Sequence, residues 1–149
     1  MHKPCLYIIG SLRNPEIPTI AKEIRQTTKL EIFDDWWSAS EDADEWWQRH
    51  ANFKGETYEQ AINGHHALHV FSFDYAHLNR SSGGILVLPA GRSAHLEAGY
   101  LRGQNKRLYI LFDSEPERFD VMYRFANGGV HFNMESLTKQ INYDFDTTS

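Results

Sequence analysis

Residues 84–100, GILVLPAGRSAHLEAGY, place an apolar run, a short loop and a helical segment in immediate succession. The run Ile85–Leu88 lies between glycines and Pro89, the pattern of a strand that is covered on both faces. We expect a helix from Ser93 to Gly103, with Ser93 as its N-cap. A buried strand that leads directly into a helix is the repeating unit of a parallel α/β sheet.

In the rest of the chain, predicted strands and helices also alternate. Further strands are predicted at Cys5–Ile9, Lys29–Phe33, Arg107–Phe112 and Val130–Phe132. Helices are predicted in a segment opened by Pro15 and Pro18, at Glu41–Phe53, at Thr57–Leu78 with a break near Gly64 or after Phe73, at Glu115–Ala126 and at Met134–Ile141. The polar tail Asp144–Ser149 is expected to be loose. The sequence therefore predicts one domain, residues 1–149, with a doubly wound (flavodoxin/Rossmann-like) α/β fold: a parallel sheet of about five strands with helices on both faces.

Composition narrows the class of protein. The chain has 149 residues, of which 41% are hydrophobic, and a net charge of -5. Proteins that bind duplex nucleic acid carry a basic excess, so we expect no such partner. The single cysteine, Cys5, cannot form an internal disulfide, which fits a reducing compartment. No signal-peptide pattern and no apolar stretch long enough to span a membrane is present, so we expect a cytoplasmic protein that is not associated with a membrane.

In a doubly wound sheet the ligand site lies beyond the carboxyl ends of the strands, where the strand order reverses. This rule selects four places: 10–14, 34–37, 73–74 and 89–97. The acidic residue Glu97 lies about one turn into its helix, near the positive N-terminus. It either complements the helix dipole or acts as a catalytic carboxylate. The small neighbours Ala94, Ala98 and Gly99 predict tight packing of this helix on the sheet and favour the catalytic interpretation.

The other polar candidates allow two interpretations each. Ser11 and Arg13 follow the first strand and bind a phosphate or a sugar hydroxyl, or form a turn with one exposed arginine; there is no P-loop motif. Asp34 and Trp36 contact a nucleobase or belong to the core. The second pair of tryptophans, Trp46 and Trp47, is expected to pack on the core or on a subunit interface.

The histidines do not predict a metal centre. His65 and His69 are four residues apart, but a zinc site needs at least a third ligand. We therefore expect helix-surface histidines, no metal and no cofactor. His95 contacts a ligand or contributes to packing or capping.

The segments LYIIGSLRN (6–14), FDDWW (33–37), FSFDYAHL (71–78) and ILVLPAGRSAHLEAGY (85–100) resemble the nucleoside 2-deoxyribosyltransferase superfamily, above all its short phage- and bacteria-borne members, which include nucleotide N-glycosidase-like proteins. The likeness runs from about residue 5 to residue 141. It implies a doubly wound enzyme that cleaves the bond between a (deoxy)ribose and a base. Some members transfer the sugar to another base, and others hydrolyse a nucleotide.

The resemblance also implies roles for single residues. Glu97 matches the catalytic glutamate, Tyr7 matches the tyrosine that positions it, and Gly10 with Ser11 matches the substrate-facing turn. The transferases carry two aspartates that flank the third strand, and this chain departs from them with Ser82 near the first position and Gly91 at the second.

The departure affects the expected substrate. The loss of the two acids and the presence of Arg92 and Ser93 at a helix N-terminus would suit a phosphate, and Asp74 becomes the candidate for contact with the base. The expected function is therefore cleavage of the N-glycosidic bond of a (deoxy)nucleoside or nucleoside 5′-monophosphate. The alternatives are a 5′-monophosphate hydrolase without base transfer and a non-catalytic nucleotide-binding sensor. The expected partners are the small-molecule nucleoside or nucleotide and further copies of the chain, as a dimer or larger homo-oligomer formed through aromatic residues of 36–47 or of the C-terminal helix.

Overall fold

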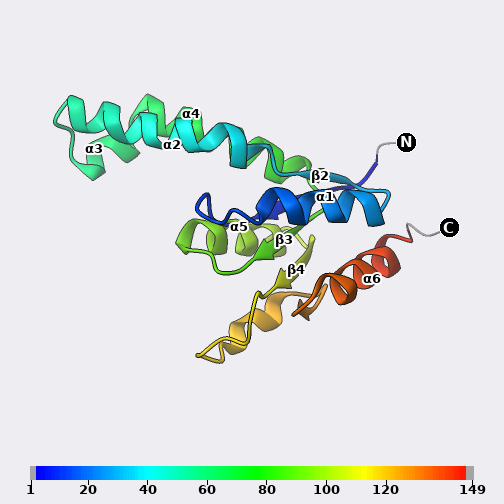
Figure 1. Cartoon of the computed structure of the whole chain (residues 1–149). Helices are drawn as coiled ribbons and strands as arrows, with labels where there is room; N and C mark the ends of the chain where they lie inside the picture. The colour runs from blue at the N-terminus through cyan, green and yellow to red at the C-terminus, as the bar shows by residue number, and fades with distance from the viewer. Residues whose placement is uncertain (1–2, 147–149) are drawn as a thin grey trace.

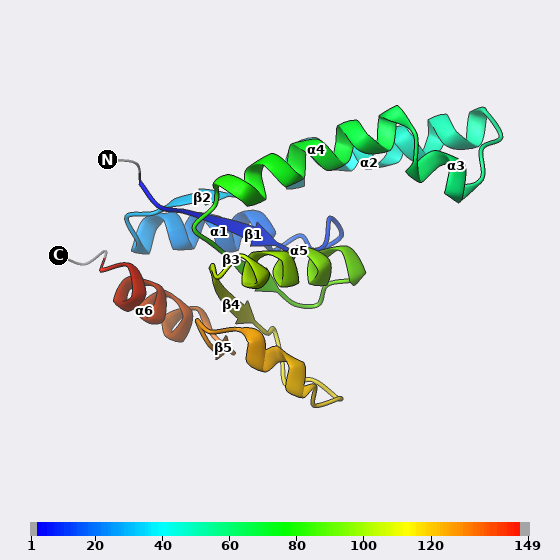
Figure 2. The same cartoon turned by 180° about the vertical axis from the view of Figure 1, so that it is seen from behind.

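The computed structural model describes residues 3–146, and within them it describes 38–44 by their backbone alone. In this part of the chain five strands form one parallel sheet in the order β2-β1-β3-β4-β5 (Figures 1 and 2). The strands are β1 (Cys5–Ile9), β2 (Glu31–Phe33), β3 (Gly83–Val87), β4 (Arg107–Leu111) and β5 (Val130–His131). This topology confirms the predicted doubly wound α/β fold.

Helices cover both faces of the sheet. One face carries α1 (Ile17–Thr27) and α6 (Met134–Phe145), and the Asn142 side chain joins them by donating to the Thr27 carbonyl at 3.0 Å. The opposite face carries α4 (His65–Arg80) and α5 (Arg92–Gly103), which is seen best from behind (Figure 2). No helix in the described residues is long and apolar enough to cross a membrane.

A helical arm extends beyond the edge of the sheet. It consists of α2 (Asp35–Phe53), the short α3 (Tyr58–Ile62) and the first half of α4, as both views of the whole chain show (Figures 1 and 2). The predicted break at Gly64 is confirmed, because Gly64 is the N-cap of α4. The helix predicted at 41–53 begins earlier, directly after β2, so α2 starts beside the sheet and carries the chain away from it.

The helix predicted at 115–126 is wrong. The chain instead runs without regular structure from 112 to 120 and forms only the 3-10 helix η1 (Val121–Phe125). A helix is stabilised mainly by burying one apolar face, and residues 113–120 contain no buried side chain. Asp120 then starts the short helix by accepting the Met122 amide at 2.9 Å.

The polar tail is also ordered further than predicted. Helix α6 continues to Phe145, and the side chain of Asp144 is only 7% exposed. The Tyr109 hydroxyl donates to Asp144 at 2.7 Å, and Arg107 lies 3.7 Å from the same carboxylate. This buried acceptor binds the end of α6 to β4. The last three residues, 147–149, lie outside the described part of the chain.

Gly84 allows the close approach of α5 to the sheet, whereas Gly99 does not take part in it. A Cβ atom on Gly84 would stand 2.5 Å from Leu101 Cδ1 of α5 and 2.9 Å from Ile9 Cδ1 of β1. Glycine is therefore required where α5 crosses β3. Gly99 was predicted to serve the same purpose, and that prediction is wrong: a Cβ there would meet nothing within 4 Å, and Gly99 is exposed. Ala98 is the neighbouring small residue that is buried in the core.

The same substitution at the two glycines should therefore have opposite effects. Gly84→Ala should lower the free energy of unfolding by about 1–3 kcal/mol, because the added methyl group overpacks the β3–α5 contact. Gly99→Ala should raise it by about 0.5–1 kcal/mol through helix propensity. Urea denaturation of both variants tests this expectation. Destabilisation by Gly99→Ala of the size seen for Gly84→Ala would contradict it.

Candidate active site

A cavity of about 320 Å³ lies at the carboxyl ends of β1 and β3. Strands β1 and β3 are neighbours in the sheet, but the helices that follow them, α1 and α5, cover opposite faces. The cavity therefore lies at the point where the strand order reverses. All the site residues predicted from the sequence except Asp34 line this cavity: Tyr7, Gly10, Ser11, Arg13, Trp36, Asp74, Gly91, Arg92, Ser93 and Glu97. Segments that are far apart in the sequence are thus brought together by the strand order.

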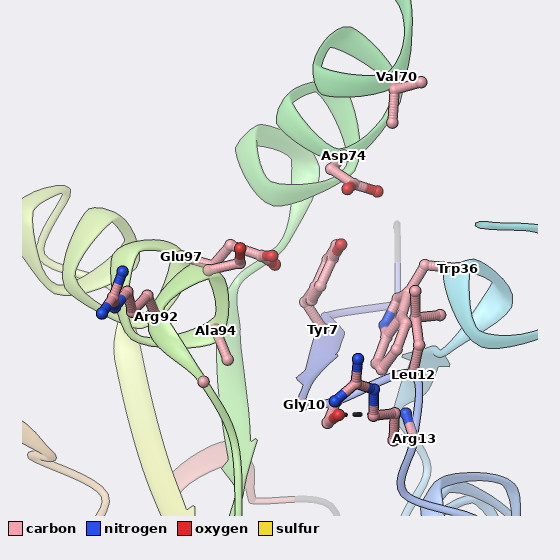
Figure 3. A pocket seen from close by; sticks show the side chains of 13 residues that line it. Tyr7, Gly10, Leu12, Arg13, Trp36, Val70, Asp74, Arg92, Ala94 and Glu97 are labelled. Atoms are coloured by element: carbon pink, nitrogen blue, oxygen red, sulfur yellow. Dashed lines mark hydrogen bonds between the residues drawn. The ribbon is translucent and has the colours of Figure 1, made fainter. Parts of the chain in front are cut away.

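Three side chains from three elements point toward one another at the centre of the cavity. Figure 3 shows the Tyr7 hydroxyl, which rises from β1, between the carboxylates of Glu97 on α5 and Asp74 on α4. Tyr7 is buried. Burial, the two negative charges and hydrogen bonding to both carboxylates raise the pKa of Tyr7 far above its usual value. The hydroxyl therefore keeps its proton and can donate it in a hydrogen bond.

The central glutamate is held in an environment that disfavours its charge. The pKa of Glu97 is raised from 4.5 to about 8: burial is the largest cause, the negative charge of Asp74 adds to it, and hydrogen bonding with Tyr7 partly offsets both. A carboxylate that merely complements a helix dipole would be solvated and would have an ordinary pKa. Paired acids with perturbed pKa values in a cavity are instead typical of functional sites. The environment of Glu97 therefore favours the catalytic interpretation over the structural one.

Polar groups surround this centre. Ser11 Oγ accepts the Arg13 amide at 3.1 Å, and Arg13 itself is exposed. In Figure 3 Arg13 and Arg92 lie on opposite sides of the Tyr7–Glu97 pair, with the head of Arg92 turned away from Tyr7. The prediction that Ser93 caps α5 is wrong, because α5 begins at Arg92 and its N-cap is Gly91, which makes no side-chain capping bond. The first amides of α5 are therefore available to an anion.

The remaining wall of the cavity is apolar. The Trp36 indole donates to the Ile8 carbonyl at 2.6 Å, which fixes the ring, and the residue both belongs to the core and lines the cavity. The prediction that Trp36 belongs to the core is confirmed, and its contact with a nucleobase stays a prediction. Leu12 and Val70 complete this wall and were missed in the sequence. Val70 was discoverable from Asp74, because residues four apart share one face of a helix.

The predicted candidates outside the cavity have other contacts. Asp34 pairs with Arg25 at 2.5 Å and does not line the cavity. His95 contacts the Gly91 carbonyl through Nδ1 at 2.7 Å and the Tyr123 hydroxyl through Nε2 at 2.9 Å, so it supports the loop from behind. No group of three or more His, Cys, Asp or Glu side chains within the described residues is placed to hold a metal ion.

The fold and this site define a doubly wound α/β protein with an acidic centre, a polar rim and an aromatic wall at the switch point of its sheet. No family model and no curated protein matches the sequence.

The raised pKa of Glu97 makes a prediction for stability. The folded state holds the Glu97 proton more tightly than the unfolded state does. The free energy of unfolding should therefore fall as the pH rises from 4.5 to about 8, and above that pH the loss of stability should be complete and constant. Glu97→Gln removes this cost. Its unfolding free energy should exceed that of the wild type by up to about 3 kcal/mol at pH 9, and by much less at pH 5.

Urea denaturation at the two pH values measures this difference. The matched control is Glu23→Gln, an exposed position on α1, which should show no gain at pH 9 relative to pH 5. An equal effect of Glu97→Gln at both pH values would show that Glu97 does not carry the raised pKa.

Proposed function

We propose that this protein cleaves the N-glycosidic bond of a nucleoside or nucleoside 5′-monophosphate, with Glu97 acting at the anomeric carbon. One observation carries the proposal: Glu97, Tyr7 and Asp74 converge from three elements inside one cavity at the switch point of the sheet. The resemblance of 91–100, GRSAHLEAGY, to the nucleoside 2-deoxyribosyltransferase superfamily supports the same assignment.

The chemistry requires a carboxylate of this kind. When the bond between C1′ and the base nitrogen breaks, its electron pair leaves with the base and positive charge develops on C1′ and the ring oxygen. The ionised Glu97 stabilises this centre or forms a bond to C1′. A positive centre next to Glu97 also favours its ionised form, which counteracts the effect of burial and of Asp74. The oxygen of a water molecule, or a nitrogen of an acceptor base, then bonds to C1′, and any bond between C1′ and Glu97 breaks. The proton that this attacking group loses balances the one that the departing base gains.

The neighbouring residues fit supporting roles. The departing base must gain a proton or a hydrogen bond, and Asp74 is the candidate to contact it. The Tyr7 hydroxyl hydrogen-bonds with Glu97 and Asp74, donating its one proton to one carboxylate at a time, and orients Glu97. The flat, fixed ring of Trp36 and the side chains of Leu12 and Val70 offer the apolar surface on which a base can pack.

The rim favours a phosphorylated substrate. It contains two arginines, two serines and a helix start without a side-chain cap, and Gly91 stands where the transferases that the chain resembles carry an acid. These groups would attract the 5′-phosphate, whereas an acid at that position would repel it. The 5′-monophosphate is therefore the preferred substrate, and hydrolysis is preferred over transfer.

Homo-oligomerisation and a cytoplasmic location complete the proposal. Of the aromatic residues suggested for an interface, Trp46 on α2 is 52% exposed and Tyr143 on α6 is 82% exposed, whereas Trp36 is buried. Cys5 is buried on β1, where desolvation raises its pKa, so it is suited to remain a reduced thiol.

Base release from a panel of nucleosides and 5′-monophosphates, with and without an acceptor base, tests the reaction. We expect release from monophosphates without an acceptor. Glu97→Gln should lower the rate at least about 100-fold, and Glu23→Gln should leave it unchanged. Acceptor-dependent release from unphosphorylated nucleosides would instead establish a transferase. Tight binding without release from any substrate would establish a nucleotide-binding protein.

The phosphate assignment has its own test. Arg13→Ala should raise KM for a 5′-monophosphate by roughly 10–100-fold, because a charge-assisted contact is lost, and should change KM for the matching nucleoside little. Arg49→Ala, on the exposed arm, is the matched control and should change neither. An equal loss for both substrates would show that Arg13 does not contact the phosphate.

A further inference from the structure

A second cavity, of about 370 Å³, lies on the other side of α5 from Glu97 and shares no lining residue with the first. It exists because the connection from β4 to β5 forms only the short η1 where an α-helix would have covered the sheet. Its floor is the sheet itself: Leu86 of β3 with Leu108 and Ile110 of β4, each no more than 3% exposed.

The α5 side of this cavity is open because side chains are missing there. Gly99 and Gly103 both line it, and a Cβ atom on either would have nothing within 4 Å. Glycine is the least favourable residue after proline inside a helix, and no close contact within the described chain requires it at Gly99.

The polar side chains at the cavity wall already bind other groups of the protein. Both ring nitrogens of His95 are engaged, by the Gly91 carbonyl and the Tyr123 hydroxyl. Arg102 donates to the Phe125 and Lys106 carbonyls at 2.8 and 3.1 Å, and Asp120 caps η1. The surface that these groups leave to an occupant is therefore mainly apolar.

We propose that the cavity between α5 and η1 is a binding site for a small, uncharged, apolar molecule with one or two fused rings. Its volume falls within the roughly 300–1,000 Å³ of ligand pockets and exceeds the about 150 Å³ apolar cavity that takes a benzene ring. The recessed floor suits a small molecule better than a second copy of the chain, which would first meet Met122 and Phe125, each 58% exposed. The proposal does not depend on the reaction proposed for Glu97.

Methyl-labelled methionine gives a direct test, because the chain has three methionines and only Met122 among the two described lines the cavity. The probes are the apolar bicycle indene and its polar isostere purine. We expect indene to shift the Met122 methyl signal saturably and to leave that of Met134 on α6 unchanged. Purine should not shift Met122 at the same concentrations.

Substitutions in α5 test whether indene binds in this cavity. Gly99→Leu places a side chain in the open space and should weaken indene binding at least tenfold, with an unchanged Met134 signal as evidence of folding. Gly103→Leu fills the same cavity from the last residue of α5 and serves if Gly99→Leu does not fold. Leu96→Ala, an exposed position on the same helix that does not line the cavity, should bind indene like the wild type.

Three results would each overturn the proposal. The first is the absence of a saturable Met122 shift up to the solubility limit of indene. The second is an equal shift with purine. The third is a Met122 signal that changes with protein concentration in the absence of any probe, which would assign this face to contact with a second copy.

Discussion

The contact between Gly84 and Leu101 fixes α5 against the sheet, and the site depends on it. A Cβ atom on any other residue at 84 would stand only 2.5 Å from Leu101 Cδ1. Glu97 lies one helical turn before Leu101, so it shares that inward face but reaches past the end of β3. Tyr7 pairs with Gly84 in the neighbouring strand, which brings its hydroxyl under the carboxylate. The absence of a Cβ atom at Gly84 thus allows the approach of α5 that brings Glu97 to Tyr7.

This arrangement places two acids, Glu97 and Asp74, close together in a partly closed cavity, where burial and mutual repulsion disfavour their charged forms. Asp74 comes from α4, whose second half returns from the helical arm to lie against α5; the Tyr100 hydroxyl donates to Asn79 at 2.6 Å and ties the two helices together. Without that connection the like charges could separate. The structure instead keeps Glu97 and Asp74 close, and places the protonated Tyr7 between them. Strain of this kind has no benefit for folding and is typical of functional sites, which fits the role that we propose for Glu97.

The sequence was sufficient for features that depend on local patterns. The apolar runs gave β1 without error and β3 and β4 within about two residues, and the order of strands and helices gave the parallel sheet. Because strand ends meet at a known edge, the site loops followed from the same reasoning. The errors concern long-range packing. Charged residues at 115–120 looked helical but have no face to bury, Asp144 looked solvated but is bound by Tyr109, and Asp34 lies at the right strand end but is held by Arg25.

Helix α5 presents a different chemistry on each of its sides, and the helical repeat explains how. Ala94, Ala98 and Leu101 face the sheet, Glu97 faces the acidic centre, and Gly99 and Gly103 face the second cavity. His95 connects these sides. Its Nδ1 must carry the proton, because the Gly91 carbonyl can only accept, so in the neutral ring Nε2 accepts from the Tyr123 hydroxyl. The loop that lines the first cavity is therefore held by the same side chain that forms part of the wall of the second.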